Sequence, residues 1–221
     1  MIKALNKASF GKLAWLSPLV MLLGVYGGTT NVLPLPWIWL VLCGSLALYL
    51  QFGNTDVRTA SLQKMPKDAW KIIVIAILGS FFFTYLSLFV GNWLGFTAVA
   101  NANASNAGPV LERIIHLSKL SFSLIGEELI TASVAFPAYV FLKSRMDASK
   151  AWIYASIISA LLFGMIHVNI YHWNLWQCLV ATGLTRLPFN WAWKKTDSLQ
   201  GGIWAHIIYD LIVLIPPMFF F

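Results

Sequence analysis

Seven long apolar segments follow one another along the 221-residue chain, and they constrain its fold more than any other feature. A helix needs about 17 to 25 apolar residues to cross a bilayer, and only helices and closed barrels satisfy the backbone hydrogen bonds there. The composition agrees, because 59% of the residues are hydrophobic and only 10% are charged. We therefore predict an all-α integral membrane protein with about seven transmembrane helices, at 12–28, 34–53, 70–96, 114–142, 151–170, 174–193 and 199–220.

Two segments between these spans are polar or rich in small residues. Residues 54–69 indicate a loop or a short surface helix, and residues 97–113 indicate a loop. The chain shows no internal repeat, so we divide it into three spans with their loops at 1–113 and four spans at 114–221. The first 28 residues resemble a signal peptide but lack a small-x-small cleavage site, so we expect an uncleaved first span.

The basic residues predict the orientation of the spans. Nearly all lysines and arginines lie before the first span or in alternate loops after it, whereas Arg113 and Lys119 lie on the other side. Because cytoplasmic loops carry the excess of positive charge, this pattern predicts a multi-pass protein with its N-terminus inside and its C-terminus outside. The net charge of +7 is explained by this orientation, so we do not expect nucleic acid as a partner.

Two glutamates, two histidines and an aspartate lie deep in the apolar spans of the second half of the chain: Glu127, Glu128, His167, His206 and Asp210. An acid at the bilayer centre costs about 2.5–3.5 kcal/mol on insertion scales, so such residues normally face a cavity or a partner and mark a functional path. A polar cluster that only holds helices together is the alternative.

Helix geometry places these groups at a similar depth. At a rise of about 1.5 Å per residue, Glu127, His167 and Asp210 lie roughly 23–26 Å from the nearest cytoplasmic basic residue. His206 and Asp210 are four residues apart and share a helix face. Because neighbouring helical residues point about 100° apart, Glu127 and Glu128 cannot both face one site, so we expect one reacting group and one supporting group.

Three short motifs in these spans carry a family resemblance. They are EELITA at 127–132, FGMIH at 163–167 and HIIYD at 206–210. They resemble the motifs EExxxR, FxxxH and HxxxN/D of the CPBP family, which comprises type II CAAX prenyl endopeptidases and the Abi proteins of bacteriocin processing and immunity. The resemblance covers residues 114 to 215 and implies an intramembrane endopeptidase with a CAAX-protease-like helical core in 114–221.

The resemblance also implies roles for the site residues. Glu127 would activate a water that His167 helps to position, while His206 and Asp210 would line the pocket near the oxyanion and Glu128 would support the site. This mechanism requires no cofactor. The alternative is a zinc site, in which His167, His206 and Glu127 would supply two imidazoles and one carboxylate.

One position departs from the family motif. The arginine of EExxxR is Ala132 in this chain, so Glu128 lacks the partner expected four residues further along the helix. We hypothesise that Arg186, which lies inside the span 174–193, supplies this charge from another helix. The alternative is that Arg186 extends to the membrane interface. We also count Phe163, from the FxxxH motif, among the supporting residues.

The expected function is hydrolysis of a peptide or membrane-protein substrate in a bacterial cytoplasmic membrane, in bacteriocin self-immunity or peptide maturation. A non-catalytic immunity or partner-binding protein, or a small proton-coupled transporter, is the alternative. Cys43 and Cys178 lie in apolar runs and form no CxxC, so we expect packed thiols.

Overall fold

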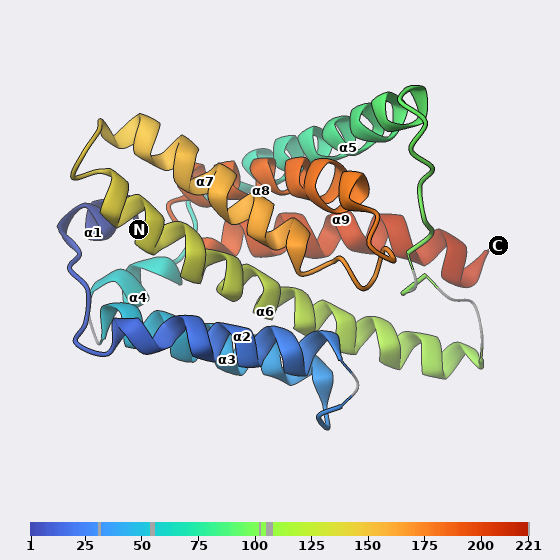
Figure 1. Ribbon diagram of the computed structural model, residues 1–221, viewed down its shortest axis with the longest axis horizontal. Coiled ribbons are helices and arrows are strands. Elements are labelled where there is room, and N and C mark those ends of the chain that lie inside the picture. The colour runs from blue at the N-terminus through green and yellow to red at the C-terminus, as the bar shows by residue number, and fades with distance from the viewer. Residues whose placement is uncertain (31, 54–55, 102, 105–107, 221) are drawn as a thin grey trace.

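The computed structural model describes residues 1–30, 32–53, 56–101, 103–104 and 108–220, which form a bundle of helices (Figure 1). No strand occurs in these ranges, which agrees with the predicted all-α membrane fold. The short element η1 is a 3-10 helix and η2 is a π-helix. In chain order the elements are α1 (Ile2–Lys7), η1 (Ala14–Leu16), α2 (Ser17–Thr29), α3 (Pro36–Phe52), α4 (Asp56–Ser61), α5 (Ala69–Trp93), α6 (Val110–Leu142), α7 (Ala148–Met165), η2 (Trp176–Thr182), α8 (Gly183–Thr196) and α9 (Leu199–Phe219).

Each of the seven predicted spans corresponds to a helix, but the helices differ in length. By length and composition, α5, α6, α7 and α9 could cross a membrane, whereas α2 and α3 are shorter apolar helices. The 17 residues of α3 extend about 25 Å at 1.5 Å per residue, a little less than the roughly 30 Å hydrocarbon core. The sixth segment is divided between η2 and α8. The number of crossings and their orientation therefore stay predictions.

Some boundaries differ from those expected. Helix α6 begins at Val110, so it takes in the end of the predicted loop 97–113, and α7 ends at Met165, five residues before the predicted end. The segment 54–69 contains the short helix α4. Residues 54–55, 102 and 105–107 of the two predicted loops lie outside the described residues.

Helix α6 occupies the centre of the bundle, with α2 and α3 on one side and α7 and α9 on the other (Figure 1). It is the most buried of the four long apolar helices. Small residues allow its close contact with α3: a Cβ added at Gly126 would lie 2.5 Å from the Cβ of Leu40, and one added at Gly44 would lie 2.7 Å from the Cβ of Leu129. This approach fixes α6, and with it the two glutamates, against the N-terminal helices.

Two apolar clusters hold the C-terminal helices around α6. The larger joins α6, α7, α8 and α9 and includes Phe136, Trp152 and Trp193. The smaller joins α5, α8 and α9 through Phe189 and Tyr209. Both clusters include residues next to the polar groups of the three motifs.

The outer surface is apolar, as a bilayer environment requires. Helix α5 exposes Phe82, Phe89 and Trp93 to more than half of their full area. Cys43 and Cys178 are buried and free, as predicted.

Candidate active site

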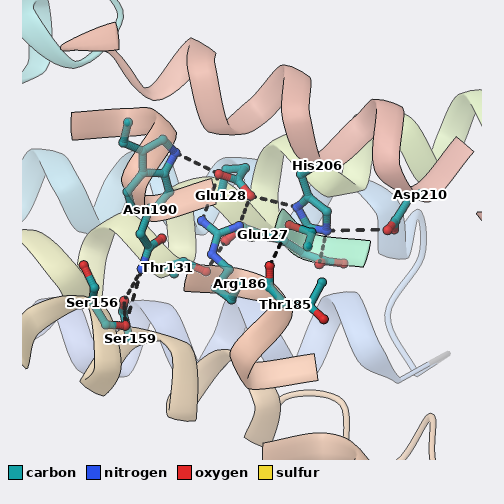
Figure 2. A network of polar contacts seen from close by, with 12 residues as sticks. Glu127, Glu128, Thr131, Ser156, Ser159, Thr185, Arg186, Asn190, His206 and Asp210 are labelled. Atoms are coloured by element: carbon teal, nitrogen blue, oxygen red, sulfur yellow. Dashed lines mark hydrogen bonds and ion pairs between the residues drawn. The ribbon is translucent and has the colours of Figure 1, made fainter. Parts of the chain in front are cut away.

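Three segments bring the five predicted ionisable residues together in the bundle interior, and Figure 2 shows Glu127, Glu128, His206 and Asp210 among them. Glu127 and Glu128 come from α6, His206 and Asp210 come from one face of α9, and His167 follows the end of α7. The five ionisable groups form one network of short contacts. The predicted convergence is therefore present in the structure.

Glu128 is fully buried and its carboxylate is surrounded by donors. Arg186 contacts both oxygens, with Nη2 donating to Oε2 at 2.8 Å and Nη1 donating to Oε1. Trp193 Nε1 donates to Oε2 at 2.9 Å, and His206 Nδ1 lies 2.7 Å from Oε1. A buried carboxylate is tolerated when an opposite charge and several hydrogen bonds replace its hydration, and Glu128 has both.

Arg186 comes from α8 and is fully buried, so it does not extend to the membrane interface. Its guanidinium carbon lies 5.1 Å from the ring centroid of Phe163 and 4.6 Å from that of Trp193, distances at which aromatic faces attract a cation. Ala132, at the position of the motif arginine, is fully buried in the larger apolar cluster. The ion pair to Glu128 thus comes from another helix, as the sequence hypothesis supposed.

His206 is held with one nitrogen toward Glu128 and the other toward the site. Because a carboxylate can only accept, the contact at Oε1 of Glu128 places a proton on Nδ1 of His206. The imidazole stacks on Phe189 with 4.9 Å between ring centroids, which fixes its plane. Nε2 therefore faces Oε2 of Glu127 at 4.0 Å and Oδ2 of Asp210 at 3.8 Å.

His167 is oriented by a contact with the C-terminal end of the preceding helix, α7. Its Nδ1 lies 2.8 Å from the carbonyl oxygen of Phe163, and a carbonyl can only accept, so Nδ1 carries a proton here as well. Nε2 is then directed into the site, 3.9 Å from Oε2 of Glu127. The FxxxH motif has a physical reason in this arrangement, because residue i supplies the carbonyl and packs its ring on the imidazole of residue i+4.

Glu127 differs from Glu128 in having no donor for its Oε2 atom. This oxygen is buried and makes no hydrogen bond within the described residues, although both imidazole Nε2 atoms face it. Distances of 3.9 and 4.0 Å are too long for direct hydrogen bonds. The two adjacent glutamates therefore occupy distinct environments, because both oxygens of Glu128 have donors and Oε2 of Glu127 has none among the described residues.

Glu127 also lines a cavity of about 240 Å³. A water takes roughly 30 Å³ of liquid volume, so the cavity has room for several waters or for a short piece of extended chain. Its polar wall is formed by the predicted residues Glu127, His167, Arg186, His206 and Asp210, with Phe163 beside them.

The opposite wall contains polar residues that the sequence reasoning missed. Thr84 of α5 lies 2.7 Å from the hydroxyl of Tyr209 and 2.6 Å from that of Thr185, and all three residues line the cavity. Trp193, the second donor to Glu128 from α8, was also missed. The available signal was a lone threonine within the apolar run FFFTYLSLF and a tyrosine next to Asp210.

The donor set has the chemistry of a zinc site, but its arrangement does not fit one. His167, His206 and Glu127 offer two imidazole nitrogens and a carboxylate, which is a familiar zinc set. Within the described part of the chain, however, no group of three or more His, Cys, Asp and Glu side chains is placed to hold a metal ion. We therefore derive no step that passes through a metal.

Comparison with known proteins supports the resemblance of the motifs. A family model described as type II CAAX prenyl endopeptidase Rce1-like matches residues 110–212, a range that contains all three motifs and the hydrogen-bond and ion-pair partners described above for the Glu127 and Glu128 side chains. No curated protein and no solved structure was found to match the chain. Residues 110–212 of this multi-pass membrane protein therefore match the Rce1-like family of type II CAAX prenyl endopeptidases, in agreement with the resemblance that the three motifs carry.

Proposed function

We propose that the chain is an intramembrane endopeptidase in which Glu127 activates water for attack on a peptide bond. The observation that carries this proposal is that Oε2 of Glu127 faces two imidazole nitrogens without a hydrogen bond within the described residues, while the residue lines a cavity. A carboxylate used only to hold helices together would have its oxygens satisfied, as those of Glu128 are. This contrast favours catalysis over a purely structural cluster.

The proposed reaction begins with a water between Glu127 and His167. Glu127 removes a proton from this water while Nε2 of His167 accepts the second hydrogen bond and orients the lone pair. The water oxygen bonds to the carbonyl carbon, and the carbonyl electron pair moves onto oxygen. When the carbon–nitrogen bond breaks, the proton held by Glu127 passes to the leaving nitrogen. Atoms and charges then balance without a cofactor.

The oxyanion would be stabilised on the α9 side of the cavity. His206 can donate from Nε2 when it is protonated, and Glu128 stabilises that imidazolium through Nδ1. Asp210 donates if it is protonated, and it orients His206 if it is ionised. The fixed geometry of these groups in a desolvated cavity strengthens their effect on the developing charge.

The family match and the apolar helices support a proposed biological setting. We propose a location in a bacterial cytoplasmic membrane, with the bilayer around the outer helix faces and a peptide or membrane protein as substrate. Bacteriocin self-immunity or peptide maturation is the specific role proposed, because the three motifs are shared with the Abi branch of the CPBP family.

Cleavage by variants of two residues tests the proposal. We expect membranes with the wild-type chain to release peptides, identified by mass spectrometry, that Glu127→Gln and His167→Ala fail to release. Removing a general base typically costs about 10²–10⁴-fold in rate. The matched control is Glu112→Gln, which changes an exposed acid in the first turn of the same helix and should retain wild-type cleavage. Full activity in both site variants, with the protein in the membrane, would refute the mechanism.

A further inference from the structure

The segment 96–101 follows α5 at one end of the bundle and lies between two cavities (Figure 1). Val99 of this segment lines the cavity of about 240 Å³ beside Glu127. Its neighbour Ala98 lines a second cavity, of about 230 Å³. Gln177 of η2 lines both cavities. The contact between the segment and Gln177 is therefore at the boundary between the two cavities.

Two side-chain amides hold the main chain of this segment. The N–H of Val99 donates to Oε1 of Gln177 at 2.7 Å, and Nε2 of Gln177 donates to the carbonyl oxygen of Val99 at 2.8 Å. Nδ2 of Asn174 donates to the carbonyl oxygen of Thr97 at 2.8 Å. Because a main-chain N–H can only donate and a carbonyl can only accept, the bonds to Val99 fix the orientation of the Gln177 amide. Gln177 thus pairs with both main-chain groups of Val99, as a neighbouring β-strand would.

Little apolar packing supports these hydrogen bonds. Thr97 and Ala98 are exposed, and Phe96, whose ring stacks on that of Trp176 at 5.2 Å, is itself 46% exposed. The backbone of Gly95, just before the segment, has a φ of 86°, a left-handed conformation that glycine adopts without strain. Segments with few buried apolar contacts and exposed hydrogen bonds open at a low cost in free energy. The bonds to the two amides therefore decide whether the segment stays in place.

We propose that segment 96–101 is a gate to the cavity beside Glu127, and that it opens when Val99 leaves Gln177. Opening joins the two cavities, each of which alone is smaller than the roughly 300 Å³ at which ligand pockets usually begin. A peptide then enters between α5 and η2, whose residues line the second cavity. The route of the peptide rests on the proposed proteolytic function, whereas the opening itself does not.

The reaction of a cysteine inside the cavity with a water-soluble maleimide measures the opening. Ala181 lines the cavity and is 5% exposed, so Ala181→Cys places a thiol there with a small change in volume. The full chain is labelled in detergent, and protein without this cysteine gives the background from the buried Cys43 and Cys178. Because labelling through a brief opening follows the open fraction, the measurement needs neither substrate nor catalysis.

Two variants remove hydrogen bonds of the gate. Gln177→Leu removes both bonds to Val99, and Val99→Pro removes the N–H donor. We expect each variant to raise the labelling rate of Ala181→Cys by about fivefold or more. Val99→Ile keeps the main-chain N–H, so it is the matched control and should leave the rate unchanged. Unchanged labelling in Gln177→Leu and Val99→Pro would overturn the proposal.

A variant that responds to pH separates opening from unfolding. In Gln177→Glu, a protonated side chain can still donate to the carbonyl of Val99, whereas an ionised side chain can only accept and is repelled by that carbonyl. The labelling rate of this variant, divided by that of the protein with Gln177, should therefore rise reversibly with pH. A ratio that stays constant between about pH 5 and 9, or a rise that is not reversed, would overturn the proposal.

The ratio also removes the effect of the other titratable groups. Those that line the cavity are common to both proteins: Glu127, His167, Tyr171, His206, Tyr209 and Asp210. Their titration changes the two labelling rates alike, as does the ionisation of the reporter thiol. A pH dependence of the ratio is therefore assigned to position 177.

Discussion

Arg186 of α8 and Glu128 of α6 form a buried ion pair in which two guanidinium nitrogens contact the two carboxylate oxygens. Arg186 supplies from α8 the positive charge that the family motif would supply from an arginine on α6 itself. Nη2 of Arg186 donates to Oε2 of Glu128 at 2.8 Å, and Nη1 donates to Oε1. Glu128 also contacts His206, which faces the reaction cavity. The pair therefore ties α8 to α6 and, in the proposed mechanism, supports the orientation of His206.

Removing the arginine should destabilise the fold strongly. Arg186→Met leaves the Glu128 carboxylate buried without a cation, and breaking a buried pair typically costs about 3–5 kcal/mol. We expect the free energy of unfolding in detergent, measured by chemical denaturation, to fall by an amount of this order. The companion variant Glu128→Gln/Arg186→Met removes both charges and should recover much of the stability. It should not recover peptide cleavage, because His206 loses its charged acceptor. Recovery of both would show that the pair is only structural.

An arginine introduced at position 132 should partly replace Arg186. Ala132 is fully buried, so Ala132→Arg alone should be destabilising through overpacking. In Ala132→Arg/Arg186→Ala, the space left by Arg186 accommodates the new guanidinium near Glu128. The double variant should therefore be less destabilised than the sum of the single variants, with a coupling of about 0.5–3 kcal/mol.

A matched pair of variants controls for nonspecific effects of a buried arginine. Val134 lines an apolar cavity on the other side of α6, so Val134→Arg points away from Glu128. Val134→Arg combined with Arg186→Ala should show additive destabilisation in the same measurement. Coupling of equal size in both double variants would contradict the idea that position 132 can serve Glu128.

Chelators should leave cleavage unchanged. The described His, Cys, Asp and Glu side chains are not arranged to hold a metal ion, and the proposed steps use only side chains and water. We expect peptide release by the purified protein to be the same before and after prolonged treatment with EDTA or phenanthroline. Elemental analysis of the same samples should give well below one metal per chain. Loss of activity that zinc restores would instead support the set of His167, His206 and Glu127.

Stability should depend on the ionisation of Asp147 at the start of α7. The backbone N–H of Lys150 bonds its carboxylate at 3.0 Å and, together with a similar bond from Ser149, holds the pKa of Asp147 below the ordinary value of 3.8. Because the folded pKa is lowered, this stabilisation is complete above the unfolded pKa and is lost as the pH falls through the folded pKa. In thermal unfolding scans, the wild type should lose its advantage over Asp147→Ala below about pH 4. Asp147→Asn keeps an uncharged cap, so its difference from Asp147→Ala should stay constant with pH.

Hydropathy and motif spacing determined which segments are helical and which residues are chemically unusual. An apolar run has to form a helix in a bilayer whatever its neighbours are, because only then are its backbone groups satisfied. For the same reason, Glu127, Glu128 and Asp210 could be singled out by their cost in an apolar span. The rise per residue of an α-helix then predicted that these acids lie at a membrane depth similar to that of His167.

The lengths of the helices could not be read from hydropathy alone. The apolar run at 151–170 continues past Met165, but α7 ends there and His167 stands in the following turns, bonded to the carbonyl of Phe163. The run at 174–193 begins as the π-helix η2, which has a wider turn than an α-helix. A count of 3.6 residues per turn therefore does not predict where Arg186 points.

The family resemblance implied that Glu127 is the reacting acid, but only the tertiary structure shows which glutamate has an oxygen without a hydrogen-bond partner among the described residues. Glu127 and Glu128 are adjacent residues of α6, and their sequence neighbours do not distinguish them. The packing of α8 and α9 brings Arg186, Trp193 and His206 onto Glu128 and leaves Oε2 of Glu127 without a hydrogen-bond partner among the described residues. The sequence by itself determined the membrane fold, the family motifs and the missing arginine at position 132. Only the contacts between helices could decide the partner of Glu128, because helical periodicity is local and side-chain pairing depends on which faces meet.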